Sequence, residues 1–427
     1  MQRLPTVPIP IPSRLYYGWV VVAAGLAINM ATSPLNPVIF SFFISPMSAS
    51  TGWSLGTLSL AITFRLILSG LTAPLIGTTI DKFGPKWLGI LAGFVAGGSL
   101  IGLFFTHQIW FLYLLFAISG CVGLGGGPGG NLLTLVPVAK WFIRQRGRAT
   151  SIATTGMAVG TVLAIPATQW MIQNIGWREA WVVLGILVAI IIVPLSFLFL
   201  RGAPSDLGLE IMEGKDKKAK VPIIIEDDWT AKEALRNPVS WLILTAYSVG
   251  GFALTGVLLH RVAYWESLGI SPTLVAFGTA LDPLTFMFSV VLFGIIGERV
   301  KMQHLGLYGG LVFTLSMVAI ITSTGQTYTI IVHNIVWAAG GGAYITTNNL
   351  IWPNYFGRKF LGTIRGIVFP IQVAATGLGP PVYGFLLDSG VAPKSLWVIS
   401  ALLFTIAGLL LFLAKPPQRR ITTIEKQ

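Results

Sequence analysis

Arg65 is the residue of this sequence whose placement most clearly requires a chemical explanation. It lies ten residues into the apolar run 55–80. An arginine at the middle of a bilayer costs about 3 kcal/mol on insertion scales, and intramembrane charges usually mark pathways. A guanidinium can bind a carboxylate through two parallel hydrogen bonds. We therefore predict that Arg65 binds a substrate carboxylate; the alternative is a permanent ion pair, with Asp282 as the partner.

Asp282 is the acidic counterpart of Arg65 and lies in the apolar run 273–297. A carboxyl group held away from water near a fixed cation is suited to gaining and losing a proton, so Asp282 is our candidate for proton coupling. The following Pro283 supports another interpretation, because residues before proline avoid helical backbone. Asp282 would then cap a helix that begins again at Pro283. Both interpretations stay open.

His260 and Arg261 lie toward the end of the apolar run 238–264, beside Tyr264 and Trp265. Tryptophan and tyrosine concentrate at membrane interfaces. His260 is a candidate for relaying protons, gating or binding substrate, because histidine titrates near neutral pH; the alternative is an ordinary interfacial histidine. For Arg261 we favour the simpler interpretation, a side chain whose charged end extends to the interface.

Neutral polar side chains form a second set of candidates. Their amide and phenol groups can donate hydrogen bonds to a carboxylate or a hydroxyl. Bonding between helices is the commoner role for any one asparagine in a bundle. The candidate substrate contacts are Asn29, Tyr344 and Gln372, which lie nearest the middle of their runs, and Asn131, which lies nearer one end.

Acidic residues end two of the apolar runs in matching positions. Asp81 and Glu298 each complete the pattern Gly-x-x-x-acid-base. An acidic group is favourable at the N-terminal end of a helix. We predict that both residues are gates that reach helix N-termini of the opposite half, with Arg365 as the expected partner of Asp81. Ordinary charges that orient the chain in the membrane are the simpler alternative.

The elements that hold these residues are predicted to be membrane helices. Of the 427 residues, 54% are hydrophobic and 10% are charged, and the mean hydropathy is +0.78. Because a soluble domain usually carries about 25% charged residues, soluble enzymes, disordered chains and fibrous proteins are excluded. Runs of about 20 apolar residues can cross a bilayer as helices. Twelve such runs occur, at 17–43, 55–80, 87–105, 109–138, 149–173, 178–200, 238–264, 273–297, 303–323, 327–352, 363–387 and 395–414.

The positive charges predict the orientation of the chain. With both termini in the cytoplasm, all but four of the 28 lysine and arginine residues fall on the cytoplasmic side, as the positive-inside rule requires. The formal charge of +13 then faces anionic lipid rather than nucleic acid. We predict a multi-pass protein of the cell membrane that functions as a monomer.

The two halves of the chain repeat one another, which predicts two related six-helix bundles. The pattern that ends at Asp81 recurs 217 residues later, and Pro166 recurs as Pro380 at an offset of 214 residues. We divide the chain into a bundle at 1–200, a cytoplasmic linker at 201–237 and a bundle at 238–427. Every third run lacks amide, histidine and charged side chains away from its ends, so we expect these helices to be peripheral and the others to line a cavity.

The sequence resembles the major facilitator superfamily over essentially its whole length, and within it the bacterial branch of monocarboxylate porters and oxalate/formate antiporters. The motifs that carry the resemblance are Tyr16-Tyr-Gly-Trp-Val-Val-Val22, Asp81-Lys-Phe-Gly-Pro-Lys86, Gly176-Trp-Arg-Glu-Ala180, Glu233-Ala-Leu-Arg-Asn-Pro238, His260 with Leu268-Gly-Ile-Ser271, and Tyr355-Phe-Gly-Arg358 with Gly362. The resemblance implies alternating access between two bundles. In one departure, Val290 occupies the position where this branch often carries an arginine.

Together these features predict a secondary transporter of a small organic anion, such as lactate or pyruvate, that works by proton symport or anion exchange. The alternatives are a transporter of an inorganic anion such as nitrate, an exporter of amphipathic compounds, and a membrane sensor that transports nothing. An enzyme is not expected. The formal dinucleotide pattern Gly125-x-Gly127-x-x-Gly130 is rejected because it lies inside an apolar run with no strand before it. One cysteine and four histidines without paired spacing predict no metal and no cofactor.

Overall fold

The structure is a computed structural model that describes residues 16–124, 131–142, 146–204, 229–297, 299–357 and 360–417. Across these ranges the regular elements are all helices, which confirms the predicted fold class. The dinucleotide-like glycine pattern and most of the predicted linker lie outside the described residues.

The described part of the N-terminal half contains eight α-helices and two short 3-10 helices. They are α1 (Tyr17–Ala31), η1 (Ser33–Leu35), α2 (Pro37–Thr51), α3 (Leu55–Phe83), α4 (Pro85–Gly102), η2 (Leu103–Phe105), α5 (Ile109–Gly120), α6 (Leu132–Trp141), α7 (Arg146–Ile175) and α8 (Trp177–Leu198).

A short helix precedes the six long helices described in the C-terminal half. The short helix is α9 (Ala231–Arg236), and the long ones are α10 (Pro238–Ser267), α11 (Pro272–Gly297), α12 (Met302–Thr322), α13 (Thr327–Phe356), α14 (Leu361–Asp388) and α15 (Pro393–Leu413). Helix α9 begins with a capping box, in which Thr230 and Glu233 satisfy each other's backbone amides.

The twelve predicted runs correspond to twelve membrane segments, of which two are interrupted. Among the described residues, eight helices are individually long and apolar enough to cross a bilayer, and α13 and α14 are comparably long at 30 and 28 residues. The first predicted run is divided into α1, η1 and α2 and extends to Thr51. Pro34 and Pro37 lack backbone amides, and the Asn36 side chain caps α2 by accepting from the Val38 amide at 3.0 Å. The fourth run is divided into α5 and α6.

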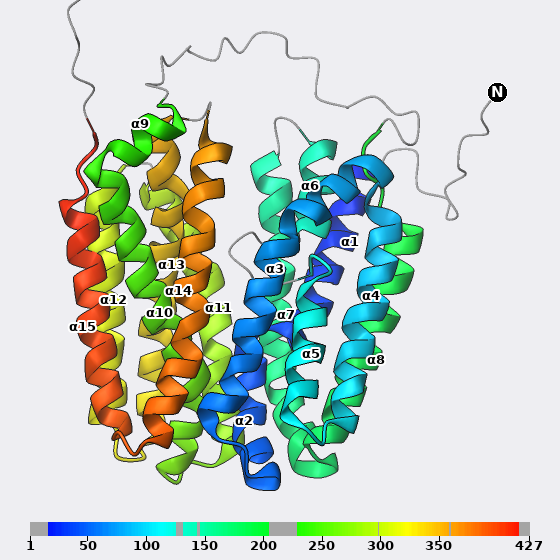
Figure 1. The fold of residues 1–427 in the computed structure, drawn as a ribbon, viewed down its shortest axis with the longest axis vertical. Coiled ribbons are helices and arrows are strands. Elements are labelled where there is room, and N and C mark those ends of the chain that lie inside the picture. The colour runs from blue at the N-terminus through cyan, green and yellow to red at the C-terminus, as the bar shows by residue number, and fades with distance from the viewer. Residues whose placement is uncertain are drawn as a thin grey trace, which may run out of the picture.

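The helices form two groups, α1–α8 on one side and α10–α15 on the other (Figure 1). The predicted peripheral helices are α4, α8, α12 and α15. They pack in pairs, α4 against α8 and α12 against α15. The two groups meet mainly where α3 contacts α14, where α7 contacts α11, and where α2 contacts α10.

One end of the molecule joins the two groups tightly, and we call it the joined end. It carries the turns at Gly52 and Gly390 and lies at the bottom of Figure 1, where α2 is drawn. Between described residues, the hydrogen bonds that connect the groups lie in this half of the molecule. They include those of Asp388 with Leu55 and Gly56, Ser59 with His260, Thr63 with Gly377, and Thr273 with Gln173. The predicted orientation places the joined end outside the cell.

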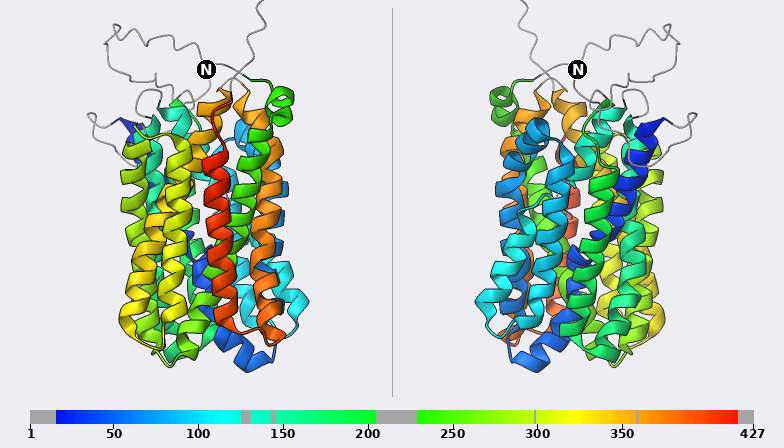
Figure 2. Two further views of the ribbon diagram at one scale, coloured as in Figure 1. Left: turned by 90° about the vertical axis from the view of Figure 1, so that its left-hand side faces the viewer. Right: turned by 90° about the vertical axis from the view of Figure 1, so that its right-hand side faces the viewer.

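Helices α3 and α14 lie side by side but separate toward the other end (Figure 1). Each side view in Figure 2 looks onto one of the two groups of helices. At the joined end, a Cβ atom added to Gly384 would lie 2.5 Å from the backbone of Gly56. Toward the other end, a Cβ atom added to Gly77 or to Gly366 would meet no atom within 4 Å. The same two helices are therefore in backbone contact at one end and free at the other.

Candidate functional site

The Arg65 guanidinium is buried among the interrupted segments of the N-terminal half. Its residue is 3% exposed. One terminal nitrogen donates to the carbonyl of Leu35 in η1, and the other donates to the carbonyl of Leu124 at 3.4 Å. The Leu35 carbonyl is available because the amides of Val38 and Ile39 both bind Asn36 instead. The proline break in the first segment thus provides one of the two acceptors that hold Arg65.

Arg65 is not paired with Asp282, so that alternative is wrong for this structure. The carboxylate of Asp282 binds Arg261 instead. Within the described part of the chain, no acidic group lies within ion-pair distance of Arg65. The Arg65 Nε atom is buried and has no hydrogen-bond partner there. A buried cation without a counterion carries a desolvation penalty of several kcal/mol, which a bound anion would offset.

Arg261 lies inside the C-terminal half, so the predicted placement at the membrane interface is wrong. The residue is 0% exposed, and one of its terminal nitrogens forms a hydrogen-bonded ion pair with Asp282. Its guanidinium carbon also lies 5.2 Å from the ring centre of Trp337. The neighbours that suggested an interface, Tyr264 and Trp265, are themselves buried, and their rings pack against Trp397 and His333 on other helices.

His333 completes this charge cluster, and its role was not predicted from the sequence. Its Nδ1 atom lies 2.9 Å from the carbonyl of Ser316, so Nδ1 carries the hydrogen and donates it. The Nε2 atom then has a free lone pair, which accepts a hydrogen bond from Arg261 at 3.4 Å. His333 has no second histidine at a paired spacing, so that pattern gave no signal for it. The rule that an intramembrane histidine requires a polar partner would have singled it out.

Asp282 lies within a continuous helix, so the alternative interpretation of this residue as a helix cap is wrong. Helix α11 runs from Pro272 to Gly297 through Pro283, as membrane helices can when neighbouring groups satisfy the freed carbonyl. Asp282 is 7% exposed. The next residue, Pro283, lines a pocket of about 110 Å³ between α11 and α7. Pro283 therefore lies at a boundary between the two groups of helices, and Asp282 precedes it in α11.

Two of the predicted substrate contacts hold helices together in this structure. The Asn29 side-chain amide donates to the Thr134 hydroxyl at 3.0 Å and to the Ala153 carbonyl at 2.9 Å, so both of its hydrogens are used. The Tyr344 hydroxyl lies 3.3 Å from the Tyr247 carbonyl on α10, and the two tyrosine rings are 4.7 Å apart.

Three other predicted contacts are buried and keep polar atoms without partners among the described residues. These atoms are Nε2 of Gln372, Nδ1 of His260 and both polar side-chain atoms of Asn131. The Nε2 atom of His260 lies 2.9 Å from the Pro380 carbonyl and 3.3 Å from the Ser59 hydroxyl. His260 is therefore part of the contact between the two groups of helices.

The predicted gating residues fall largely outside the described part of the chain. Glu298 lies outside it, and Asp81 belongs to α3 but its side chain is not described. Arg365 donates to the carbonyls of Asn348 and Asn349 at 2.7 and 3.2 Å. In this conformation Arg365 thus binds α13 of its own half.

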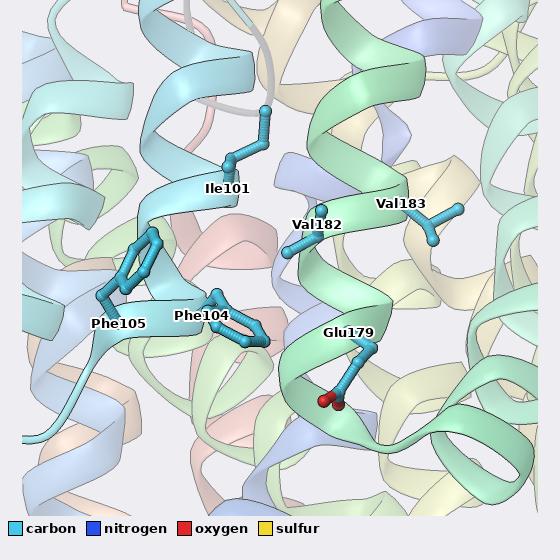
Figure 3. Close-up of a pocket in the computed structure, with 6 residues that line it drawn as sticks. All are labelled: Ile101, Phe104, Phe105, Glu179, Val182 and Val183. Carbon is cyan, nitrogen blue, oxygen red and sulfur yellow. The ribbon is translucent and has the colours of Figure 1, made fainter.

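A larger pocket, of about 400 Å³, lies between η2 with the end of α4 and the start of α8. Figure 3 shows Ile101, Phe104 and Phe105 on one side and Val182, Val183 and Glu179 on the neighbouring helix. Its lining is apolar except for Glu179, and it belongs to the peripheral helix pair of the N-terminal half. It does not include any of the candidate substrate contacts.

Substituting Asn29 tests which of its two roles dominates. We expect Asn29→Ala to lower the free energy of unfolding in detergent by about 1–2 kcal/mol, because Thr134 and Ala153 lose their donor. The KM for the substrate should change little. Gln372→Ala is the matched control, since its amide nitrogen is unpartnered among the described residues. A raised KM with unchanged unfolding for Asn29→Ala would instead restore the substrate contact predicted from the sequence.

Comparison with known proteins gives one family across most of the chain. The sequence profile of the Major Facilitator Superfamily matches residues 18–369. The oxalate:formate antiporter of Oxalobacter formigenes is 22% identical over 382 residues, which cover 87% of this chain and 85% of that protein. Monocarboxylate transporter 2 of Mesocricetus auratus is 22% identical over 450 residues, which cover 98% of this chain and 88% of that protein.

Two solved structures share the fold at low sequence identity. A bacterial homologue of the human lysosomal transporter Spinster, in an inward-facing and occupied conformation, has a TM-score of 0.72 and 14% identity, and the match covers 95% of this chain and 97% of that one. The nucleoside transporter NupG has a TM-score of 0.69 and 10% identity, and the match covers 94% of this chain and 99% of that one.

Proposed function

The chain belongs to the major facilitator superfamily, and from this premise we propose that it carries a small organic anion, such as lactate or pyruvate, across the cell membrane. Like its relatives, it is a transporter and not an enzyme. The proposed substrate is a monocarboxylate, and the proposed coupling ion is a proton. We place both termini in the cytoplasm and the joined end outside.

The observation that carries this proposal is that Arg65 is buried without an acidic partner among the described residues. Its guanidinium is buried and held by two carbonyls, and its Nε has no partner among the described residues. The two carbonyls supply partial charges but no full negative charge. A carboxylate substrate would supply that charge and would accept the remaining donors. This complementarity supports an anionic cargo over a neutral one.

The Arg261–Asp282 pair supports proton coupling. Arg261 is balanced by Asp282 while that carboxyl group is ionised. A proton on Asp282 would leave Arg261 without a counterion and would favour the binding of an anion. Asp282 directly precedes Pro283, which lines the pocket between α11 and α7, and we propose that the access of its carboxyl group to water changes as the two groups of helices move. Proton and anion would then cross together.

The separation of α3 from α14 supports alternating access. The two helices are in contact at the joined end and free toward the other end, which corresponds to an inward-open state in the proposed orientation. Closing the cytoplasmic end would bring Asp81 and Glu298 to the helix N-termini of the opposite half, and Arg365 would exchange its α13 carbonyls for Asp81.

Uptake into proteoliposomes tests this proposal. We expect the purified protein to take up labelled lactate or pyruvate, and an inward proton gradient to raise the accumulation several-fold. Oxalate, formate and nitrate are tested in parallel, with a neutral amphipathic compound as the control. Uptake of nitrate alone would favour an inorganic anion carrier. Transport of the amphipathic compound without any anion would contradict the proposal, and so would the absence of uptake for every compound tested.

A further inference from the structure

The carboxylate of Asp388 binds the first amides of a helix in the opposite half. Asp388 is the last residue of α14, and α3 begins at Leu55. Asp388 Oδ1 accepts from the Leu55 amide at 3.0 Å, and Oδ2 accepts from the Gly56 amide at 2.8 Å. The first amides of a helix lack partners within the helix, and the helix dipole favours negative charge there. Both carboxylate oxygens of Asp388 thus accept hydrogen bonds from the first amides of α3, across the boundary between the halves.

Glycines allow the two helix ends to approach closely enough for this contact. A Cβ atom on Gly384 would lie 2.5 Å from both the amide nitrogen and the Cα atom of Gly56. The Phe385 amide nitrogen would lie 2.7 Å from a Cβ atom on Gly56. Neither contact can be relieved by rotating a side chain, because backbone atoms are involved on both sides. The first turn of α3 and the last turn of α14 are therefore in direct backbone contact.

Helices α3 and α14 run in opposite directions, so each ends where the other begins. Asp388 ends α14 at the start of α3, and Asp81 lies near the end of α3 on the side where α14 starts. Toward that second end the helices are apart at Gly77 and Gly366. One helix pair thus carries an acidic residue near each end, and the described contact is made at one end.

We propose that Asp388 is a latch that holds the joined end shut and so sets the balance between the two access states. Its bonds to Leu55 and Gly56 form when α3 and α14 meet at this end and break when they part there. The inference rests on the proposed alternating access. It adds a second acidic residue that controls access, at the end of the α3–α14 pair opposite to Asp81. Because Asp388 is exposed, added salt weakens the latch.

The test measures how readily the joined end opens. The parent protein carries Cys121→Ser, which removes its single cysteine, and Leu66→Cys, which places a thiol opposite Gly377 on α14. A membrane-impermeant maleimide is added to intact cells from the side of the joined end. We expect Asp388→Ala to raise the labelling rate about fivefold, the scale expected for loss of a helix cap. We also expect high salt to raise the labelling rate of the parent protein but not that of Asp388→Ala.

A second pair of variants tests the latch without removing the acid. Gly384→Ala places a methyl group against the Gly56 backbone, whereas Gly366→Ala places one in open space on the same helix. We expect faster labelling with Gly384→Ala and the parent rate with Gly366→Ala. Labelling of Asp388→Ala at the parent rate would overturn the latch. Faster labelling in a protein that transports no anion would uphold the latch and reject the proposed function.

Discussion

Replacing Arg65 with alanine is expected to lower anion uptake by at least about 100-fold while the protein still folds. The loss corresponds to about 2.7 kcal/mol, the scale of one or two hydrogen bonds to a charged group. The protein should still fold, because among the described residues no acidic group forms an ion pair with Arg65. Removing Arg65 therefore leaves none of them as an unpaired buried charge. Among the described residues, the carbonyls of Leu35 and Leu124 are the groups that lose a donor. Uptake is measured in proteoliposomes, with size-exclusion chromatography and thermal unfolding as measures of folding.

Arg65→Lys and Arg65→Gln separate the roles of charge and geometry. Lysine keeps the charge but cannot donate from two planar nitrogens to Leu35 and Leu124 and still present a third donor. We therefore expect Arg65→Lys to retain a small part of the uptake and Arg65→Gln to retain almost none. If Arg65→Gln folds and transports at the rate of the unsubstituted protein, Arg65 is a structural residue and not part of the anion site.

The second large effect is expected from breaking the buried pair of Arg261 and Asp282. Arg261→Ala leaves the Asp282 carboxylate without its partner in an apolar interior, so we expect a loss of about 3–5 kcal/mol in the free energy of unfolding. Adding Asp282→Asn should recover most of this loss, because the uncompensated charge is removed. The measurement is a double-mutant cycle of unfolding in detergent.

Asp282→Asn alone tests proton coupling. We expect this variant to exchange substrate but to lose the extra accumulation driven by an inward proton gradient, since an amide cannot take up the proton. His333→Gln is the matched control, because glutamine can still accept a hydrogen bond from Arg261 while Asp282 stays intact. Gradient-driven accumulation by Asp282→Asn would show that Asp282 is structural.

The fold could be predicted from the sequence because each membrane segment must satisfy its own backbone and present an apolar surface. Hydropathy therefore located the segments, and the absence of amide and charged side chains predicts that α4, α8, α12 and α15 are peripheral. The interruption of the first segment has a local cause in Pro34 and Pro37, which were visible in the sequence. Its consequence, a free Leu35 carbonyl for Arg65, depends on the packing of α3 against η1 and α2.

The candidate site was predicted only in part, since ion-pair partners are tertiary contacts. Arg65 and Asp282 stood out as intramembrane charges, but hydropathy does not reveal that Asp282 pairs with Arg261 rather than with Arg65. Arg261 was assigned to the interface because tyrosine and tryptophan follow it. In the structure those rings pack against neighbouring helices. Asp388 was not singled out, because an acid near the end of a segment resembles an ordinary loop charge until α3 is placed beside it.

The central claim is that Arg65 binds the anion, and a structure of the protein with its transported anion bound tests it most directly. The anion is the one that gives the highest uptake in proteoliposomes. We predict that a carboxylate oxygen lies within hydrogen-bond distance of the Arg65 guanidinium, with its Nε among the donors. An anion bound elsewhere, with Arg65 still holding only the carbonyls of Leu35 and Leu124, would contradict the claim.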